Sequence, residues 1–384
     1  MSYRILHIMD CFLPETMNWL EKLLEESSDK CEHHIYSSFY KRPRNEKFKY
    51  VDAGINCSYP VSILSKIKNK INQASNIKQL DNYIHQQKIQ LIHFHFGNVA
   101  IQYKDWIQKT GLPFCVSLYG FDYEYLVYKN RSIKSDYVFL SKLGGRFIVE
   151  GDYSRKLIQR YGISIQQIHI VHMLYDRQHQ KSGNFFNVAE FPITYSQPIK
   201  LFQAATFTEK KNQLGLVEAL QDRHASCFII SFYGEQVDKI YFQELEKAVK
   251  SKYKHCIQIH DKISLDEYLN ALDNSHFTIN LSKRSKQNDT EGGCPVILKD
   301  GLSLGKPGIS TNHCDIPEII VNGCNGFLLP ENDHSAVTEL LDRLLLLSQK
   351  EYTKLCCNAR ESVKTNISQK ITEQDLLSVY KSMI

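Results

Sequence analysis

Two successive series of short apolar runs, separated by spacers of helical length, limit the fold of this chain more than any other feature. In the first series, buried strands are predicted at residues 3–9, 91–96, 114–118, 137–140 and 168–172. In the second series, they are predicted at residues 199–205, 227–233, 257–260 and 277–281. Helical patterns lie between them at residues 16–26, 153–161, 213–220, 242–250 and 265–272, and most of 335–384 is also predicted to be helical. Strands that alternate with helices in this way predict parallel, doubly wound sheets.

The alternation is interrupted once, between the two series. Residues 177–198 are rich in polar side chains and hold a glycine and two prolines, which is typical of a linker. A chain of 384 residues also exceeds the usual size of one domain. We therefore predict domains at 1–185 and 198–365, and a helix at 366–384 that packs back toward the first domain. Ligands of such folds favour the strand carboxyl ends at the cleft between the domains.

Composition excludes some partners and permits others. The net charge of +5 is compatible with anionic ligands or membrane surfaces, but it is too diffuse to predict a nucleic-acid partner. The 11 cysteines are scattered without a Cys-x-x-Cys pair, as is typical of reduced cytosolic thiols. No apolar run is long enough to span a bilayer, and the first residues are too polar for a signal peptide. We predict a cytoplasmic protein whose only membrane contact is peripheral.

Basic residues and one glycine follow strands of the second series. Lys211 stands at the entry to a helix, where a lysine and helix amides can bind a phosphate; the plainer alternative is a solvated lysine pair with Lys210. Gly234 could allow close backbone approach to a ligand or could simply form a tight turn. Arg284 could add a second positive charge to a diphosphate, or it could be an exposed loop residue.

Two acids in the stretch from 289 to 330 could bind a polyhydroxylated ligand. Glu291 opens this stretch, and Asp300 lies nine residues later at the predicted start of a helical run. Carboxylates accept hydrogen bonds from adjacent sugar hydroxyls, including the cis-diol of ribose. Taken singly, Glu291 is as well explained as a solvated loop acid, and Asp300 as an acid favoured at a helix N-terminus.

Polar residues also follow the strands of the first series. His93 and His95 point to the same face of a strand, which is a metal-ligand geometry, but the other ligands have no obvious source. We therefore favour a packed or substrate-facing pair over a metal site. Tyr119 and Asp122 follow the next strand, whereas Glu15 and Thr16 follow the first. Together these loops predict a ligand site at the strand ends.

Six stretches of the chain resemble one known family. In the second half they are AATFTEKKNQLGLVEAL (204–220), EGGCPVILKDGLSLGKPGIST (291–311) and DIPEIIVNGCNGFLLP (315–330). In the first half they are LPETM (13–17), HFHFG (93–97) and VSLYGFDYE (116–124). Together they resemble the retaining GT-B glycosyltransferases of family 4, including members that build exopolysaccharides. The resemblance covers nearly the whole chain.

The resemblance implies an α/β GT-B fold, with two Rossmann-like domains facing a cleft. It implies transfer of a sugar from a nucleotide diphosphate sugar to an acceptor hydroxyl of a growing cell-surface glycan or lipid-linked oligosaccharide, with retained configuration, no cofactor and no metal. The catalytic residues it implies are Glu291, Lys211, His95 and Tyr119. Donor or nucleotide binding falls to Thr206, Lys211, Gly234, Arg284, Gly292, Gly293, Cys294, Pro295 and Asp300, and acceptor binding to Glu15, Thr16 and Asp122.

The chain departs from the family pattern at three positions. Spacing from Glu291 puts Lys299 where the family has its second glutamate, whereas counting back from the Gly305-Lys306-Pro307 break puts Asp300 there. The usual arginine is Thr206. The histidine of the first-domain loop is Tyr119, whose phenol can still donate a hydrogen bond.

Other functions remain open from the sequence alone. The basic stretches 40–50 and 65–78 could contact the cytoplasmic face of the membrane, although a solvated basic face explains the charges as well. A metal-dependent hydrolase using His93, His95 and Asp122 is one alternative. A catalytically degenerate GT-B protein that only binds sugar nucleotides is another.

Overall fold

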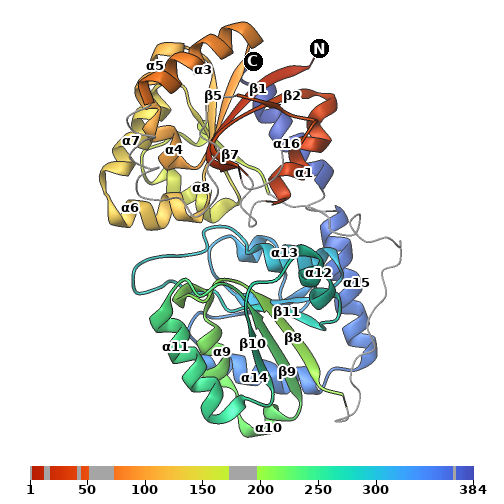
Figure 1. Ribbon diagram of the computed structural model, residues 1–384. Helices are drawn as coiled ribbons and strands as arrows, with labels where there is room; N and C mark the ends of the chain where they lie inside the picture. Colours follow the sequence, from red (N-terminus) through yellow and green to blue (C-terminus); the bar gives the residue numbers. More distant parts are fainter. Residues whose placement is uncertain (1, 13–17, 41–44, 52–72, 173–196, 366–368) are drawn as a thin grey trace. The chain divides into compact units, whose positions relative to one another are not determined.

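The computed structural model describes residues 2–12, 18–40, 45–51, 73–172, 197–365 and 369–384. These residues form two compact units (Figure 1). The first unit comprises Met1–Tyr175 together with Gln369–Ile384, and the second comprises Asp176–Ser368. The chain therefore leaves the first unit, forms the second, and returns to the first with its last helix.

The first unit is built on a seven-stranded parallel sheet in the order β3-β2-β1-β4-β5-β6-β7. Its strands are β1 (Tyr3–Phe12), β2 (Cys31–Tyr40), β3 (Lys49–Tyr50), β4 (Leu91–His95), β5 (Phe114–Ser117), β6 (Arg146–Val149) and β7 (Ile168–Ile170). Its helices are α1 (Asn18–Glu26), α3 (Gln73–Gln87), α4 (Gly97–Gln102), α5 (Lys104–Thr110), α6 (Leu126–Lys129), α7 (Ser132–Lys142), α8 (Asp152–Gln159) and α16 (Gln369–Lys381). Short turns of helix lie at Ser27–Asp29, Phe121–Tyr125 and Ile165–Gln167.

The two faces of this sheet differ in chemistry, because successive residues of a strand point to opposite sides. One face carries the apolar core, with Ile8, Phe94 and Val116 packed against α3, α4, α5 and α7. The other face carries His7 and His93, which are paired in register on β1 and β4. Helices α1 and α16 pack together on that side of the sheet (Figure 1).

The second unit is built on a six-stranded parallel sheet in the order β10-β9-β8-β11-β12-β13. Its strands are β8 (Ile199–Ala204), β9 (Phe228–Tyr233), β10 (Ile257–His260), β11 (Phe277–Asn280), β12 (Gly308–Thr311) and β13 (Gly326–Leu329). Its helices are α9 (Gln213–Ala219), α10 (Asp222–Ala225), α11 (Lys239–Ala248), α12 (Leu265–Asp273), α13 (Val296–Ser303), α14 (His334–Leu345) and α15 (Gln349–Thr365). Short turns of helix, η6, η7 and η8, lie at Glu209–Lys211, Val249–Tyr253 and Ile316–Glu318.

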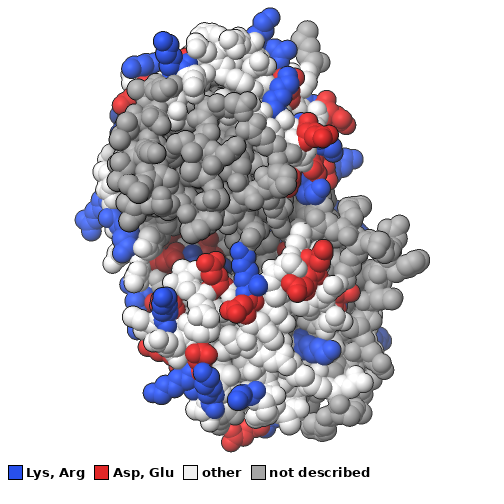
Figure 2. Space-filling view, viewed as in Figure 1, with Lys and Arg blue, Asp and Glu red and all other residues white. Residues whose placement is uncertain are grey.

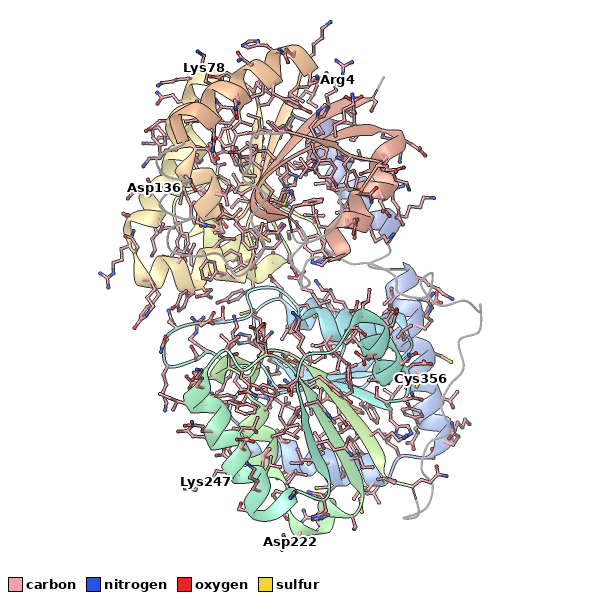
Figure 3. The ribbon with its side chains drawn as sticks, viewed as in Figure 1. Arg4, Lys78, Asp136, Asp222, Lys247 and Cys356 are labelled. Carbon is pink, nitrogen blue, oxygen red and sulfur yellow. The ribbon has the colours of Figure 1, made fainter. Side chains whose placement is uncertain are left out.

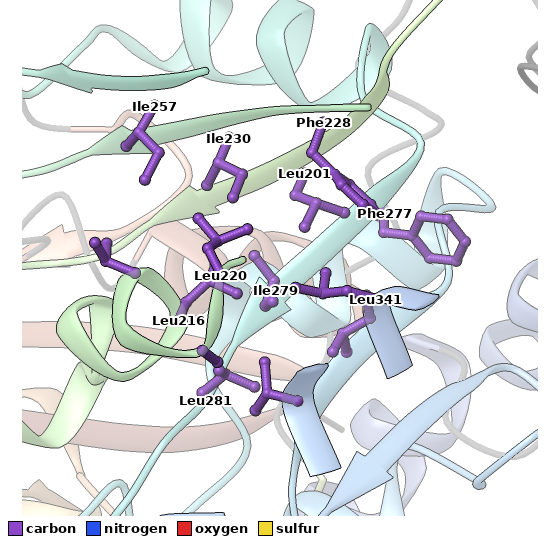
Figure 4. Packing of buried hydrophobic residues seen from close by; sticks show 14 of the residues in the cluster. Leu201, Leu216, Leu220, Phe228, Ile230, Ile257, Phe277, Ile279, Leu281 and Leu341 are labelled. Atoms are coloured by element: carbon purple, nitrogen blue, oxygen red, sulfur yellow. The ribbon is translucent and has the colours of Figure 1, made fainter. Parts of the chain in front are cut away.

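Branched and aromatic side chains fill the core of the second unit. Leu201, Ile230 and Ile279 come from three neighbouring strands and meet Leu216 of α9 and Leu341 of α14 (Figure 4). Helix α15 adds the buried Cys356, which is labelled in Figure 3. In both sheets the strand order reverses at a central pair, β1/β4 and β8/β11. The carboxyl ends at such a reversal are where open α/β sheets bind ligands.

Most predicted strands are confirmed, but one is wrong. Residues 137–140 form part of α7, and the sheet is continued instead by β6. Tyr137 and Leu140 are three residues apart, so on a helix they share the buried face. A run of four apolar residues does not distinguish these two cases.

The surface charges and the character of the helices bear on the predicted membrane contact. On the face shown in Figure 2, basic and acidic side chains are interspersed over the described surface. Lys78, at the end of the basic stretch 65–78, is exposed on α3 (Figure 3). Residues 41–44 of the first basic stretch and 65–72 of the second lie outside the described residues. Among the helices that the structure describes, none has both the length and the apolar character to cross a bilayer.

Candidate functional site

An ion pair lies where the order of the second sheet reverses. Lys211 ends the η6 turn that follows β8, and Glu291 lies in the loop between β11 and α13. The Lys211 Nζ atom is 2.6 Å from Oε2 of Glu291. The side chains are 16% and 7% exposed, so the pair is largely but not wholly removed from water.

Hydrogen bonds to the central strands hold the lysine turn in place. Gln203 donates from its amide to the backbone carbonyl of Lys211 at 3.0 Å and to Oδ1 of Asn280 at 2.8 Å. Asn212 follows with φ of 53°, a left-handed conformation that asparagine tolerates better than most residues. This residue ends the turn and starts α9. The position of Lys211 is thus fixed by its backbone as well as by its charge.

Glu291 is held by neutral donors in addition to Lys211. Ser282 donates to Oε1 at 3.0 Å, and the amide of Asn280 donates to the same oxygen at 3.3 Å. Burial by itself would raise the pKa of this carboxyl, but attraction from Lys211 and Lys210 and the hydrogen bond from Lys211 lower the pKa to about 2. Glu291 is therefore a carboxylate at neutral pH.

His313 forms a hydrogen bond with the backbone of Glu291. The backbone N–H of Glu291 donates to Nε2 of His313 at 3.2 Å. Because Nε2 accepts, the ring proton lies on Nδ1 and is donated to Glu331 at 2.8 Å. Glu331 also accepts a hydrogen bond from the backbone of Arg284 at 3.0 Å. The loops after β11, β12 and β13 are thereby joined.

Sequence reasoning missed four of these residues. Asn280 ends β11, Ser282 and His313 each follow a strand by two residues, and Glu331 does the same after β13. The available signal was their position at the carboxyl ends of strands, which had been used for Lys211 but not for them.

Lys210 is not part of a solvated lysine pair. Its Nζ atom is 3.0 Å from Oδ1 of Asp289 and 3.3 Å from the carbonyl of Thr290. The loop that carries Glu291 is therefore tied to the lysine turn at two adjacent positions. This leaves Lys211 as the lysine of the pair that faces Glu291.

Gly234 is required by its surroundings. A Cβ atom at this position would lie 1.9 Å from the carbonyl oxygen of Ala205, closer than real atoms approach. The carbonyl of neighbouring Thr206 accepts a hydrogen bond from Gln213 at 3.2 Å. The predicted close backbone approach at Gly234 is thus an approach to the chain itself.

The remaining candidates for donor binding lie in the loop between β11 and α13. Gly292 has φ of 72°, and its carbonyl accepts from the backbone of Asp315. Gly293, the buried Cys294 and Pro295 lead into the helix, with Pro295 at its N-cap. The Arg284 guanidinium donates to Asn288 at 2.8 Å on the surface.

The prediction that Asp300 lies at the start of a helix is wrong. Helix α13 starts at Val296, so Asp300 is the fifth residue and lies beyond the first turn. Its side chain is buried, and Oδ2 accepts a hydrogen bond from the Tyr268 hydroxyl at 2.8 Å. Stabilisation by the helix N-terminus falls off within the first turn and does not explain this acid.

In the first unit the structure brings His95, Tyr119 and Asp122 together. The His95 Nδ1 atom lies 3.1 Å from the Tyr119 hydroxyl. Asp122 accepts backbone N–H bonds from Gly97 and from Tyr119, both at 2.8 Å. Burial raises the pKa of Asp122 to about 7, although these backbone bonds lower it. The carboxyl thus fastens the loop after β5 to the start of α4.

Two of the predicted first-unit candidates, Glu15 and Thr16, lie outside the described residues. The alternative metal triad of His93, His95 and Asp122 is not assembled, because Asp122 is not part of the group of ligand atoms that converges on the two histidines among the described residues. His7, rather than Asp122, joins the two histidines.

The comparisons with known proteins agree with this architecture. Residues 189–362 match the family model described as glycosyl transferases group 1. Over 194 residues the chain is 26% identical to the amylovoran biosynthesis glycosyltransferase AmsK of Erwinia amylovora, covering 49% of this chain and 46% of that protein. Over 192 residues it is 25% identical to the putative colanic acid biosynthesis glycosyltransferase WcaL of Salmonella typhimurium, covering 48% and 46%. The chain thus aligns with about half the length of these curated relatives.

Solved structures match over the full length. A glycosyltransferase from Rickettsia africae has a TM-score of 0.75 at 18% identity, covering 100% of this chain and 98% of the other. Anabaena HepE in complex with UDP-glucose has a TM-score of 0.72 at 11% identity, covering 99% of both chains. With its two parallel-sheet units, the chain has the GT-B fold.

Proposed function

We propose that this protein transfers a sugar from a nucleotide diphosphate sugar to a hydroxyl of a growing cell-surface glycan, with retention of anomeric configuration. The observation that carries the proposal is the Lys211–Glu291 pair at the carboxyl ends of the second sheet. The match to the group 1 model and the similarity to two exopolysaccharide glycosyltransferases support the reaction class. A neighbouring structure with bound UDP-glucose supports the class of donor.

The pair supplies the two charges that such a donor needs. Negative charge develops on the diphosphate as its oxygen separates from the anomeric carbon, and a fixed cation stabilises that charge. Lys211 is this cation in our proposal, and Glu291 accepts hydrogen bonds from the hydroxyls of the transferred sugar. The acceptor oxygen bonds to the anomeric carbon, its proton passes to a phosphate oxygen, and the nucleotide diphosphate leaves.

The other roles follow the same division. Asp300 contacts the ribose, and Thr206, Gly234, Arg284 and the stretch Gly292–Pro295 surround the nucleotide. The acceptor, a glycan or lipid-linked oligosaccharide, binds near His95, Tyr119 and Asp122. The reaction needs no metal and no cofactor, and the protein works in the cytoplasm with peripheral contact to the membrane.

A thermal-shift panel of UDP-, GDP-, ADP- and dTDP-sugars tests the proposal, because a ligand of the native state raises Tm by mass action. We expect one nucleotide class to raise Tm in the wild type and in Lys247→Ala, which removes an exposed lysine of α11 (Figure 3). Lys211→Ala should lose that shift. An unchanged shift in Lys211→Ala contradicts the phosphate assignment.

A transfer assay with the stabilising donor then tests the reaction itself. Donor binding without either transfer or donor hydrolysis would identify a sugar-nucleotide-binding protein instead. The anomeric configuration of the product, determined by NMR, tests retention.

A further inference from the structure

Three buried histidines converge on the polar face of the first sheet. They are His7 on β1 and His93 and His95 on β4, and each is at most 2% exposed. One ring nitrogen from each lies within 4.8 Å of the others. Among the residues that the structure describes, this is the one group of histidine, cysteine and acidic side chains arranged in this way.

Strand register produces the cluster. His7 is paired with His93 across the parallel β1/β4 ladder, so the two side chains leave the sheet on the same side. His95 is two residues further along β4 and shares that side. Since neither strand can slip without moving its apolar face out of the core, the three rings are fixed together.

Hydrogen bonds on one side of the cluster determine which nitrogen of His7 is free of a proton. The hydroxyl of Ser27 donates to the carbonyls of Leu23 and Leu24, at 3.0 and 3.2 Å. It therefore accepts from Nε2 of His33 at 2.9 Å, which leaves Nδ1 of His33 without a proton. That atom in turn accepts from Nε2 of His7 at 2.9 Å. Nδ1 of His7 thus carries a lone pair, directed at Nε2 of His95 3.1 Å away.

Hydroxyl groups form hydrogen bonds with the rings of His95 and His93. Nδ1 of His95 lies 3.1 Å from the Tyr119 hydroxyl, and Nδ1 of His93 lies 2.7 Å from the Tyr380 hydroxyl of α16. Nε2 of His93 is 2.8 Å from the Ser117 hydroxyl. Histidines that bind metals characteristically have the second nitrogen held by a hydrogen bond, as Tyr119 does for His95. His93 has hydroxyl partners at both of its nitrogens.

We propose that His7, His93 and His95 bind one divalent transition-metal ion of the zinc class, with an oxygen in the fourth position. Neutral imidazole nitrogens suit zinc, which takes about four ligands at about 2.0–2.1 Å in tetrahedral geometry. Two nitrogens in such a site are about 3.3 Å apart, close to the separation of His7 Nδ1 and His95 Nε2. His93 completes the set by exchanging one of its two hydroxyl partners, Ser117 or Tyr380, for the ion.

A metal ion requires a ring nitrogen without a proton, and the hydrogen bonds from Ser27 through His33 leave Nδ1 of His7 in that form. The ion would cross-link β1 to β4 and, through Tyr380, secure α16. His95 is also assigned to the acceptor side, but none of the ligands belongs to the Lys211–Glu291 site, so metal content and donor binding are tested separately.

The third histidine is what changes the interpretation made from the sequence. In the sequence, His93 and His95 have no obvious further ligands, which favours a packed or substrate-facing pair over a metal site. The competing arrangement is a purely hydrogen-bonded network in which His95 donates from Nε2 to His7. Metal content distinguishes the two arrangements.

The test is elemental analysis of the full-length protein after removal of any affinity tag, both as purified and after reconstitution with zinc and desalting. We expect about one equivalent of zinc per chain, in keeping with a single buried three-histidine site. His93→Ala and His95→Ala should lose it. His34→Ala is the matched control, because His34 is buried on the opposite face of the same sheet with Glu32 and Tyr83 as partners.

A second measurement uses only wild-type protein, in case the variants do not fold. Cobalt added to chelator-treated protein should give the visible spectrum of a tetrahedral site, and added zinc should abolish it. Absence of bound zinc after reconstitution, or of the cobalt spectrum, overturns the proposal. Zinc retained by the folded triple variant His7→Ala/His93→Ala/His95→Ala also overturns it. The Lys211-dependent Tm shift with nucleotide sugars is measured separately and reports only on the proposed transferase function.

Discussion

At the scale of single residues, the proposed donor site depends on one buried carboxylate. Glu291 is charged at neutral pH because Lys211 and Lys210 outweigh the effect of burial. Sequence patterns could identify Glu291 and Lys211, since both lie in motifs that follow strands. For His313 the only sequence signal was its position after a strand, and its partners Glu291 and Glu331 are more than 15 residues away in the chain. The role of His7 depends on His33 and His95, which are also distant in the chain.

Glu291→Gln should reduce sugar transfer by at least about 100-fold, because the preorganised charge at the reacting sugar is lost. The measurement is kcat with saturating donor. Glu244→Gln, an exposed glutamate of α11, should leave the rate unchanged. A Glu291→Gln enzyme with wild-type turnover would contradict the role given to this carboxylate.

The same residue should affect acid stability. The folded-state pKa of about 2 is below the usual value of 4.5, so its contribution to stability is present above pH 4.5 and is lost as the pH falls toward 2. The pKa difference corresponds to roughly 3 kcal/mol at neutral pH. Urea unfolding between pH 3 and pH 7 should therefore show a weaker pH dependence in Glu291→Gln than in wild type; equal slopes would refute the assignment.

At the scale of elements, what sequence could predict depended on how clearly each segment was patterned. Strands β8, β9, β10 and β11 carry an apolar residue at every second position or more often, and they were placed within a residue or two. Strand β2, CEHHIYSSFY, has too many polar residues to be recognised as a strand. Its histidines are accommodated because His33 and His34 both find partners inside the fold.

Two loops of the first unit should depend on Asp122. In Asp122→Asn, one carboxyl oxygen becomes an NH₂ group facing a backbone N–H, which leaves a buried donor unpaired at a cost of about 1–3 kcal/mol. Urea unfolding should show this loss of stability. Asp105→Asn, at an exposed position in the first turn of α5, should cost only about 0.3–1 kcal/mol. Equal effects of the two substitutions would contradict the loop-fastening role.

Gly234→Ala should be more damaging than alanine at a glycine with open space. Gly111 has φ of 63° and nothing near its Cβ position, so alanine there costs about 1–2 kcal/mol of backbone strain. At Gly234 the new carbon would meet the Ala205 carbonyl, and the backbone after β9 must shift. Chemical denaturation should rank Gly234→Ala below Gly111→Ala in stability; the reverse order would show that this turn can adapt.

At the scale of the whole molecule, the last helix belongs to the first unit. Leu376, Leu377 and Tyr380 of α16 are all less than 5% exposed, and Lys30 forms an ion pair with Glu373 at 2.7 Å. The sequence alone predicts a helix at 366–384 that packs back toward the first domain. It could not show that Tyr380 would bind His93, because that contact joins residues 287 positions apart.

Truncation after residue 365 should therefore act on one unit. Hydrogen exchange should accelerate in β1 and β4, which lose the cover of α16, while β8–β13 keep their protection. The Lys211-dependent Tm shift with nucleotide sugars serves as a control for the second unit. Uniform acceleration in both sheets would show that α16 stabilises the molecule as a whole.

The return of α16 also has a consequence during synthesis. Domains generally fold as they leave the ribosome, with the N-terminal one first. Here the second unit is inserted between two parts of the first, so the histidine-bearing face of the first sheet emerges long before the segment that covers it. Helix α16 cannot cover that face until roughly 200 further residues have been translated. The apolar side chains on the same face, Ile5 and Leu91, are then exposed surface of the kind that chaperones bind.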